Sequence, residues 1–181
     1  ETKSVSYGTV TSSLSGASKC WITQNLGSSN QASSATDATD ASAGWYWQFN
    51  RKQGYKVGPT PAWTITAINE NSDWTATEDP CTIELGAGWR MPTRTEWINA
   101  DANGPWANST DTYNSVLKIH AAGHLAASNG SLTARGTIGY YWNSTQDNNT
   151  NSITLTFDGS NSHMGSSEDK AKGFSLRCLR D

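Results

Sequence analysis

Apolar and polar residues alternate over several short stretches of the chain, most of them in its second half. Residues 117–125, 153–157 and 174–178 alternate with a period of two, which is typical of a strand with one buried face. Clusters of Gly, Asn and Ser separate these stretches, and such clusters form turns. A weaker alternation over residues 4–11 predicts an edge strand within an N-terminal extension, residues 1–18. The pattern predicts mostly antiparallel short strands, and no internal repeat is visible.

Helical signals are confined to two segments. In residues 92–100, Thr93 and Glu96 have the spacing of a capping box, in which each side chain pairs with the backbone of the other. The Gly-Pro pair at residues 104–105 is expected to end this helix. A weaker helix is expected over residues 37–42, inside an alanine-rich stretch. Helices are therefore expected to be few and short.

The composition fits this pattern. A length of 181 residues corresponds to one domain, residues 1–181. Abundant Ser, Thr and Asn would by themselves favour disorder, but nine Trp, six Tyr and three Phe oppose it. Each aromatic ring buries roughly 150–250 Å², so these rings can build a core. We therefore predict an α+β fold that is rich in loops, with mostly antiparallel strands and one or two short helices.

The net charge and the lengths of the apolar runs exclude two classes of protein, those that bind nucleic acids through a basic surface and those that span a membrane with a helix. The net charge is −3 and Lys plus Arg total 13, so the chain lacks the basic surface that nucleic-acid binding requires. No apolar run reaches the roughly 18–20 residues that a membrane-spanning helix needs. The abundance of Ser, Thr and Asn, with little Lys and Glu, is typical of secreted bacterial surface proteins. An extracellular or cell-surface location is therefore expected.

The chain contains three cysteines, Cys20, Cys81 and Cys178, and none of them belongs to a CxxC pair. This arrangement excludes a zinc knuckle or a thioredoxin-like motif. Outside the cell, three cysteines are expected to form one disulfide and leave one thiol unpaired. The lengths of the possible loops do not discriminate between the pairings, because closing 158 residues rather than 97 differs by under about 0.5 kcal/mol.

Six stretches of the chain, taken together and in order, resemble the Fibrobacter succinogenes major paralogous domain family, a bacterial surface group with a C-type-lectin-like fold. The first stretch resembles the early W-x-x-x-N-L-G strand of that family. The stretches are Cys20-Trp21-Ile22-Thr23-Gln24-Asn25-Leu26-Gly27, Ala35-Thr36-Asp37 with Gly44-Trp45-Tyr46-Trp47-Gln48-Phe49-Asn50-Arg51, Asp79-Pro80-Cys81, Gly88-Trp89-Arg90-Met91-Pro92-Thr93 with Glu96-Trp97, Gly139-Tyr140-Tyr141-Trp142-Asn143-Ser144-Thr145-Gln146, and Gly173-Phe174-Ser175-Leu176-Arg177-Cys178.

The resemblance implies a disulfide between Cys81 and Cys178, with Cys20 unpaired, because members of the family commonly keep the later two cysteines. The residues that carry the resemblance are interpreted as scaffold. A turn leads into a capped helix, and Trp89 in the turn and Trp97 in the helix are expected in the core. This structural motif comprises Trp89, Arg90, Pro92, Thr93, Glu96 and Trp97.

Two patterns in the sequence are partly similar to metal sites. His120 and His124 have the HxxxH spacing of a helical zinc site, but their surroundings alternate like a strand, which would separate the two rings by roughly 13 Å. They are expected to be surface histidines. C-type lectins bind calcium with a Trp-Asn-Asp strand, whereas here Trp142-Asn143 is followed by Ser144. A hard-cation cage needs about six to eight oxygens. No metal or other cofactor is therefore expected.

Catalytic motifs are sparse. The chain contains no GxSxG nucleophile motif, and paired acids occur only at residues 78–79 and 168–169. Adjacent residues on a strand point to opposite faces, so these pairs are not arranged for shared acid–base chemistry. A non-enzymatic binding domain is expected, with a role in adhesion through a glycan or protein ligand on another cell or surface.

The ligand surface is expected at polar turns in the second half of the chain. Residues 158–172 show no strand period and are predicted to form an exposed loop beside a hairpin tip at residues 147–151. Polar amides near an aromatic ring are the usual components of a sugar or protein contact surface. The predicted ligand-binding residues are Asn143, Gln146, Asp147, Asn148, Asn149, Asn151, Asp158, Ser160, Asn161 and His163.

Two other functions fit the same sequence. The N-terminal edge strand would suit a structural or tip subunit of a pilus-like surface filament that associates with copies of itself. The segment from Tyr141 to Arg177 resembles the diversified tail of ligand-binding proteins encoded by retroelements, which share the fold. Its Asn and Ser residues are equally ordinary turn formers.

Overall fold

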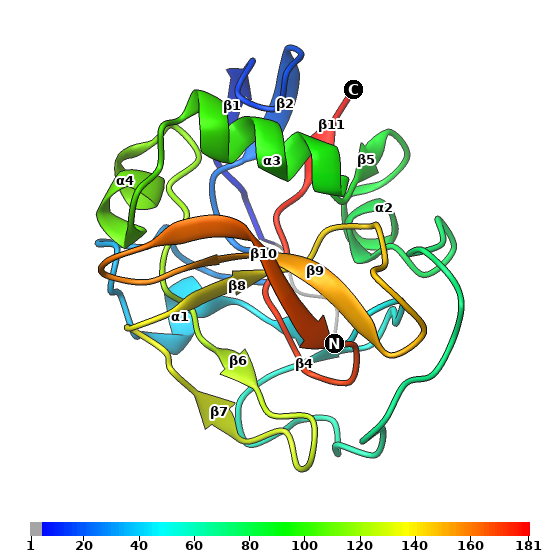
Figure 1. Ribbon diagram of the computed structural model, residues 1–181. Helices are drawn as coiled ribbons and strands as arrows, with labels where there is room; N and C mark the ends of the chain where they lie inside the picture. Colours follow the sequence, from blue (N-terminus) through cyan, green and yellow to red (C-terminus); the bar gives the residue numbers. More distant parts are fainter. Residues whose placement is uncertain (1–4) are drawn as a thin grey trace.

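Short antiparallel strands and a few short helices make up the computed structural model, which describes residues 5–181 (Figure 1). The strands are β1 (Thr9–Ser12), β2 (Lys19–Ile22), β3 (Tyr46–Trp47), β4 (Gly54–Tyr55), β5 (Trp89–Arg90), β6 (His124–Leu125), β7 (Leu132–Thr133), β8 (Gly139–Tyr141), β9 (Asn151–Phe157), β10 (Ser162–Asp169) and β11 (Leu179–Arg180). The helices are α1 (Asp40–Ala43), α2 (Pro80–Leu85), α3 (Arg94–Asn103) and α4 (Ser109–Asn114). The α+β class and the antiparallel pairing are confirmed.

The first and last strands share one sheet. Its order is β1-β2-β11-β5, so that β2 pairs on one side with β1 and on the other with the C-terminal strand. Strand β1 lies at the sheet edge, as the N-terminal alternation predicts, but it covers only Thr9–Ser12. Residues 5–8 precede it without strand structure, and Ser4 lies outside the described residues.

The prediction that residues 158–172 form an exposed loop is wrong. Most of this segment is β10, which pairs with β9 from Ser162↔Phe157 to Asp169↔Asn151 and carries a bulge between Met164 and Ser166. The side chains of β10 are mostly small and polar, so no apolar period reveals the strand. Backbone pairing with the buried strand β9 holds it in place, and α3 packs against both strands (Figure 1).

The strand predicted over residues 117–125 is also wrong, except for β6 at its end. Lys118 has φ +52° and Gly123 has φ +70°, values that interrupt an extended strand. The segment is irregular and runs through the core, so both sides of it are covered. His120 and His124 are consequently 1% and 9% exposed, and the expectation of two surface histidines is corrected.

Residues 174–178 are extended, but regular pairing begins only at Leu179. Phe174 exchanges backbone hydrogen bonds with Trp47, and Ser175 bridges to Tyr141, so this segment connects separate small sheets. Every residue from 173 to 179 is buried. The predicted strand is therefore a core segment with contacts on both faces rather than a half-exposed strand.

The capped helix is confirmed as α3. The Thr93 side chain accepts from the Glu96 N–H, and the Glu96 carboxylate accepts from the Thr93 N–H at 2.8 Å. Arg90 donates to both carboxylate oxygens of Glu96 and also to Asp181, which joins β5, α3 and the C-terminal strand region. Burial opposes ionisation of Glu96, but the hydrogen bonds from Arg90 and Thr93 outweigh it and lower its pKa. The helix ends before Gly104, as predicted.

The disulfide between Cys81 and Cys178 is confirmed, and Cys20 is unpaired and half-buried. Asp79 caps α2 by accepting from the Cys81 N–H at 2.8 Å, and its second oxygen accepts from the Met91 N–H at 2.9 Å. The bond thus ties a capped helix to the residue immediately before β11.

Aromatic rings supply many of the largest buried side chains of the core, as the composition predicts. Tyr141 and Trp142 lie in different apolar clusters, consistent with adjacent residues of an extended chain pointing to opposite faces. Trp97 is fully buried, whereas Trp89 is only partly buried and has the Arg180 guanidinium 5.3 Å from its ring centroid. The expectation of a core position therefore holds for Trp97 and is corrected for Trp89.

The buried His120 makes stability depend on pH. Neither ring nitrogen has a hydrogen-bond partner among the described residues, and burial, with nearby Arg177, lowers the pKa of His120 to about 3. An unfolded chain binds a proton at this site near pH 6.5, whereas the folded chain does not until about pH 3. Lowering the pH through this window therefore favours unfolding.

From pH 7 to pH 4.5, His120 is expected to remove about 2–3 kcal/mol of unfolding free energy. Urea unfolding of the parent and of His120→Leu at both values measures this contribution. Carboxylates titrate in both proteins, so the difference between their pH dependences isolates the histidine. Parallel curves for the two proteins would contradict the assignment.

Candidate functional site

The structure separates the predicted ligand-binding residues into two groups at opposite ends of the β9–β10 hairpin. Residues 146–150 and Asn151, the first residue of β9, lie beside the end of β10, where Ser167 Oγ donates to Asp147 Oδ2 at 2.8 Å. Residues 158–161 form the turn from β9 to β10, and His163 follows in β10. A single continuous surface formed by both groups is therefore not present.

Two of the predicted residues have structural roles. Asn143 is 0% exposed, its side chain donates to the Ile153 carbonyl oxygen, and it accepts from the Thr145 N–H. The expectation that Asn143 binds a ligand is corrected, because a side chain buried in this way cannot reach a ligand. Gln146 Oε1 accepts from the Ser72 N–H and from the buried Lys170 ammonium, so its carbonyl oxygen is already paired.

The remaining predicted residues mostly stabilise turns. Asn148 Oδ1 accepts from the N–H groups of Thr150 and Asn151, and Asp158 Oδ1 accepts from those of Ser160 and Asn161. These are the hydrogen bonds by which Asn and Asp form Asx turns. The same backbone donors lower the pKa of Asp158. Asn149, Ser160, Asn161 and His163 are exposed, but they lie on turns and a strand and do not line either cavity described below.

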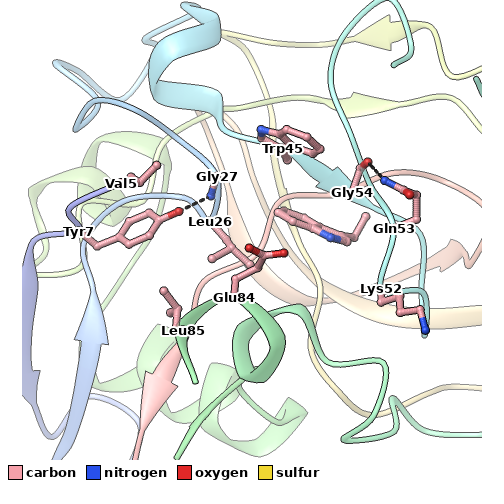
Figure 2. Close-up of a pocket in the computed structure, with 11 residues that line it drawn as sticks. Val5, Tyr7, Leu26, Gly27, Trp45, Lys52, Gln53, Gly54, Glu84 and Leu85 are labelled. Carbon is pink, nitrogen blue, oxygen red and sulfur yellow. Dashed lines mark hydrogen bonds between the residues drawn. The ribbon is translucent and has the colours of Figure 1, made fainter. Parts of the chain in front are cut away.

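A different site lies beside the β3–β4 hairpin, where a cavity of about 390 Å³ opens (Figure 2). This volume falls within the range typical of small-molecule sites. Four segments that are distant in sequence form it: the stretch before β1, the turn after β2, the hairpin and the end of α2. We call it the Trp45 cavity; its lining residues are Val5, Tyr7, Leu26, Gly27, Trp45, Trp47, Lys52, Gln53, Gly54, Glu84 and Leu85.

Two glycines position the indoles of this cavity. A Cβ on Gly27 would lie 2.5 Å from Trp45 Cδ1, and a Cβ on Gly54 would lie within 2.9 Å of both Trp45 and Trp47. Gly27 also has φ +77°, which glycine adopts without strain. Two backbone contacts also fix these residues. Trp47 pairs with Gly54 between the two strands, and the Trp45 N–H donates to the Leu26 carbonyl oxygen. The rings are therefore held by backbone rather than by flexible side chains.

The N–H groups of these two indoles have no hydrogen-bond partner in the described part of the chain. Within residues 5–181, neither Trp45 Nε1 nor Trp47 Nε1 donates a hydrogen bond, whereas Trp63, Trp97 and Trp142 each donate to a backbone carbonyl. Neither nitrogen is completely buried. The residues that line the cavity thus include two fixed indoles, each with an N–H group that can donate.

Further polar groups converge on the same space. Tyr7 Oη accepts from the Gly27 N–H at 2.7 Å, which leaves its own proton available, and burial raises the pKa of this hydroxyl. Figure 2 shows the Glu84 carboxylate between the Tyr7 side and the Trp45 side of the cavity. Gln53 donates to the Gly54 carbonyl oxygen at 2.6 Å, and its amide oxygen accepts no hydrogen bond from the described residues. Donors and acceptors therefore surround an aromatic floor.

A second cavity of about 280 Å³ shares Gly27 and Trp45 with the first. We call it the Lys56 cavity, because Lys56 lines it and its ammonium lies 5.2 Å from the Trp45 ring centroid. Asp40 and Arg135 also line it. The Trp45 side chain therefore belongs to both cavities.

Sequence reasoning missed this site because it interpreted the stretch from Gly44 to Arg51 as scaffold. A signal was present in Trp45-Tyr46-Trp47, since alternate residues of an extended chain point the same way. Tyr46 belongs to one apolar cluster, whereas Trp45 and Trp47 belong to another, as this rule requires. The remaining walls come from segments whose proximity no local spacing indicates.

These features define an α+β protein with antiparallel short strands, one disulfide and an aromatic cavity with polar walls. A domain family of unknown function, DUF8237, matches residues 102–179, which extend from the end of α3 to the start of β11. No curated protein and no solved structure gives a significant match to the chain. The matched span includes Arg135 but not Trp45, Lys56 or Glu84.

Among residues 5–181, no helix combines the length and the apolar character needed to cross a membrane. The same residues contain no group of three or more His, Cys, Asp or Glu side chains that is suited to hold a metal ion. The disulfide is consistent with an oxidising, extracellular environment.

Proposed function

We propose that the chain is a non-enzymatic, C-type-lectin-like domain of a bacterial surface or secreted protein, and that it binds a glycan in the Trp45 cavity. The resemblance of six sequence stretches to the Fibrobacter succinogenes major paralogous domain family supports the fold. The Cys81–Cys178 bond also supports it, since the resemblance implies a disulfide-tied scaffold that presents loops.

The observation that carries the glycan assignment is the pair of fixed indoles whose N–H groups have no partner among residues 5–181. A sugar ring presents C–H groups on its face and hydroxyls at its edge. An aromatic ring accepts the apolar face, while nearby N–H, O–H and carboxylate groups bind the hydroxyls. Trp45, Trp47, Tyr7 and Glu84 provide this combination in one cavity.

The carboxylate content of the cavity supports binding without hydrolysis. Glycoside hydrolases typically place two carboxyl groups about 5–9.5 Å apart across the bond that is cleaved. Glu84 is the only acidic side chain among the described residues that line the Trp45 cavity. A single exposed carboxylate suits hydrogen bonding to sugar hydroxyls.

Replacing Trp45 with Leu is expected to weaken glycan binding at least tenfold, because the substitution removes both the ring face and one donor. The test is an array of immobilised glycans probed with the parent and with Trp45→Leu, followed by calorimetry on the glycans that bind. Circular dichroism and the melting temperature establish that each protein is folded.

Trp89→Leu is the matched control. Trp89 is also partly buried and also has a cationic side chain over its ring, at 5.3 Å, but it lines neither cavity. This variant is expected to bind as the parent does. Unchanged binding by Trp45→Leu, or a parent protein that binds no glycan on the array, would overturn the proposed function.

A further inference from the structure

We propose that the ligand is an acidic saccharide whose anionic group binds in the Lys56 cavity while a neighbouring sugar ring occupies the Trp45 cavity. The inference rests on the proposed function and specifies its ligand class. The two cavities, of about 390 and 280 Å³, meet at Gly27 and Trp45. An oligosaccharide that extends past Trp45 therefore reaches both.

Lys56 supplies the first cationic group. Its side chain is exposed and forms no ion pair with any of the described residues, in contrast to Lys19, Lys52 and Lys172. Reciprocal hydrogen bonds between the backbones of Lys56 and Thr60 fix the position of its Cα. The ammonium lies 5.2 Å from the Trp45 ring centroid, at the junction of the two cavities. It is therefore available to an anion there.

Arg135 supplies the second cationic group, and hydrogen bonds fix the position of its guanidinium before any ligand binds. Its Nε and Nη2 donate to Tyr46 Oη at 3.2 and 2.9 Å, and its Nη1 donates to Asp40. A guanidinium has about five N–H bonds, so one on each Nη atom has no partner among the described residues. Carboxylate, sulfate and phosphate oxygens match such paired donors.

Asp40 partly opposes this arrangement. It is the only acidic residue among the described residues that line the Lys56 cavity, against the two cations Lys56 and Arg135. Its side chain is 80% exposed, whereas that of Arg135 is 9% exposed, so solvent weakens the field of the carboxylate more than that of the guanidinium. The cavity is thus locally cationic in a protein of net charge −3.

Because Lys56 and Asp40 carry opposite charges, replacing each of them is expected to change the affinity for acidic glycans in opposite directions. Lys56→Gln is expected to weaken binding of acidic glycans about tenfold, and Asp40→Asn to strengthen it about threefold. Because both residues line the Lys56 cavity, the readout is the ratio of the affinities for the acidic and the neutral member of each glycan pair. The control is Lys118→Gln, because Lys118 also lies 5.2 Å from an aromatic centroid, that of Tyr113, but lines neither cavity.

The probes are matched pairs of immobilised glycans: galacturonic acid oligomers with their carboxyl-reduced forms, sialylated glycans with desialylated forms, and sulfated glycans with desulfated forms. The inference is supported if the parent prefers the acidic member of a pair, Lys56→Gln loses this preference and Asp40→Asn increases it. The pair that shows the preference tells whether the anionic group is a carboxylate or a sulfate. Equal binding of both members, or acidic binding unaffected by Lys56→Gln, overturns it and leaves glycan binding intact. If no member of any pair binds, both proposals fail.

Discussion

Replacing Cys81 and Cys178 together with Ala is expected to lower the free energy of unfolding by about 4–5 kcal/mol. The two residues are 97 positions apart, so the bond restricts a large part of the unfolded chain and removes much of its conformational entropy. Domains of this size are commonly stable by only about 5–15 kcal/mol. The double variant is therefore expected to be close to unfolding at 37 °C.

Urea unfolding of the parent and the double variant, monitored by tryptophan fluorescence, measures the loss. Cys20→Ala is the control, because Cys20 forms no disulfide and is only half-buried; its cost is expected to stay within about 1 kcal/mol. A double variant as stable as Cys20→Ala would show that the bond adds nothing to the fold.

Replacing Arg177 with Met is expected to lower the free energy of unfolding by about 3–5 kcal/mol. The guanidinium is fully buried, and burial lowers its pKa to about 10, so that it stays charged at neutral pH. It donates to Asn25 Oδ1 at 2.9 Å and to the carbonyl oxygens of Ile22, Leu117 and Lys118 at 3.2, 2.8 and 2.9 Å. Methionine fills part of the space but removes all four of these hydrogen bonds; among the described residues, Asn25 Oδ1 keeps only the one from the Tyr141 hydroxyl, at 3.0 Å.

Arg180→Met is the matched control for this substitution. Arg180 is exposed, so its replacement is expected to change stability by no more than about 0.5 kcal/mol. Arg177→Lys is expected to be intermediate, because an ammonium has three donors and cannot reproduce the planar fork. Parental stability in Arg177→Met would refute the role of the guanidinium as an organiser of the core.

The parts of the fold that were predicted from the sequence depend on local rules. The capping box of Thr93 and Glu96 involves residues three positions apart, and the structure forms it as the spacing indicates. The disulfide between Cys81 and Cys178 was implied by a family resemblance, since loop entropy alone left the pairing open. Strand β9 was visible because Leu155 and Phe157 alternate with threonines.

The parts that were not predicted depend on contacts between distant segments. Strand β10 has no apolar period, and its backbone is held by pairing with β9. His120 lies in an alternating stretch that is buried on both sides, so the period did not reveal its burial. The Trp45 cavity requires Tyr7, Gly27 and Glu84 to meet, and nothing in their spacing indicates that they do.

The position of the disulfide beside the last strand also governs how the protein carries a mechanical load. Strands β1 and β11 both run antiparallel to β2 and so run parallel to each other. A pull between the start of β1 and residue 181 therefore acts along the strands and shears their hydrogen bonds together. On the C-terminal side of the disulfide, β11 can separate before tension reaches Cys178 and passes through a covalent bond to α2. This arrangement passes the load to the disulfide and α2 once β11 has separated.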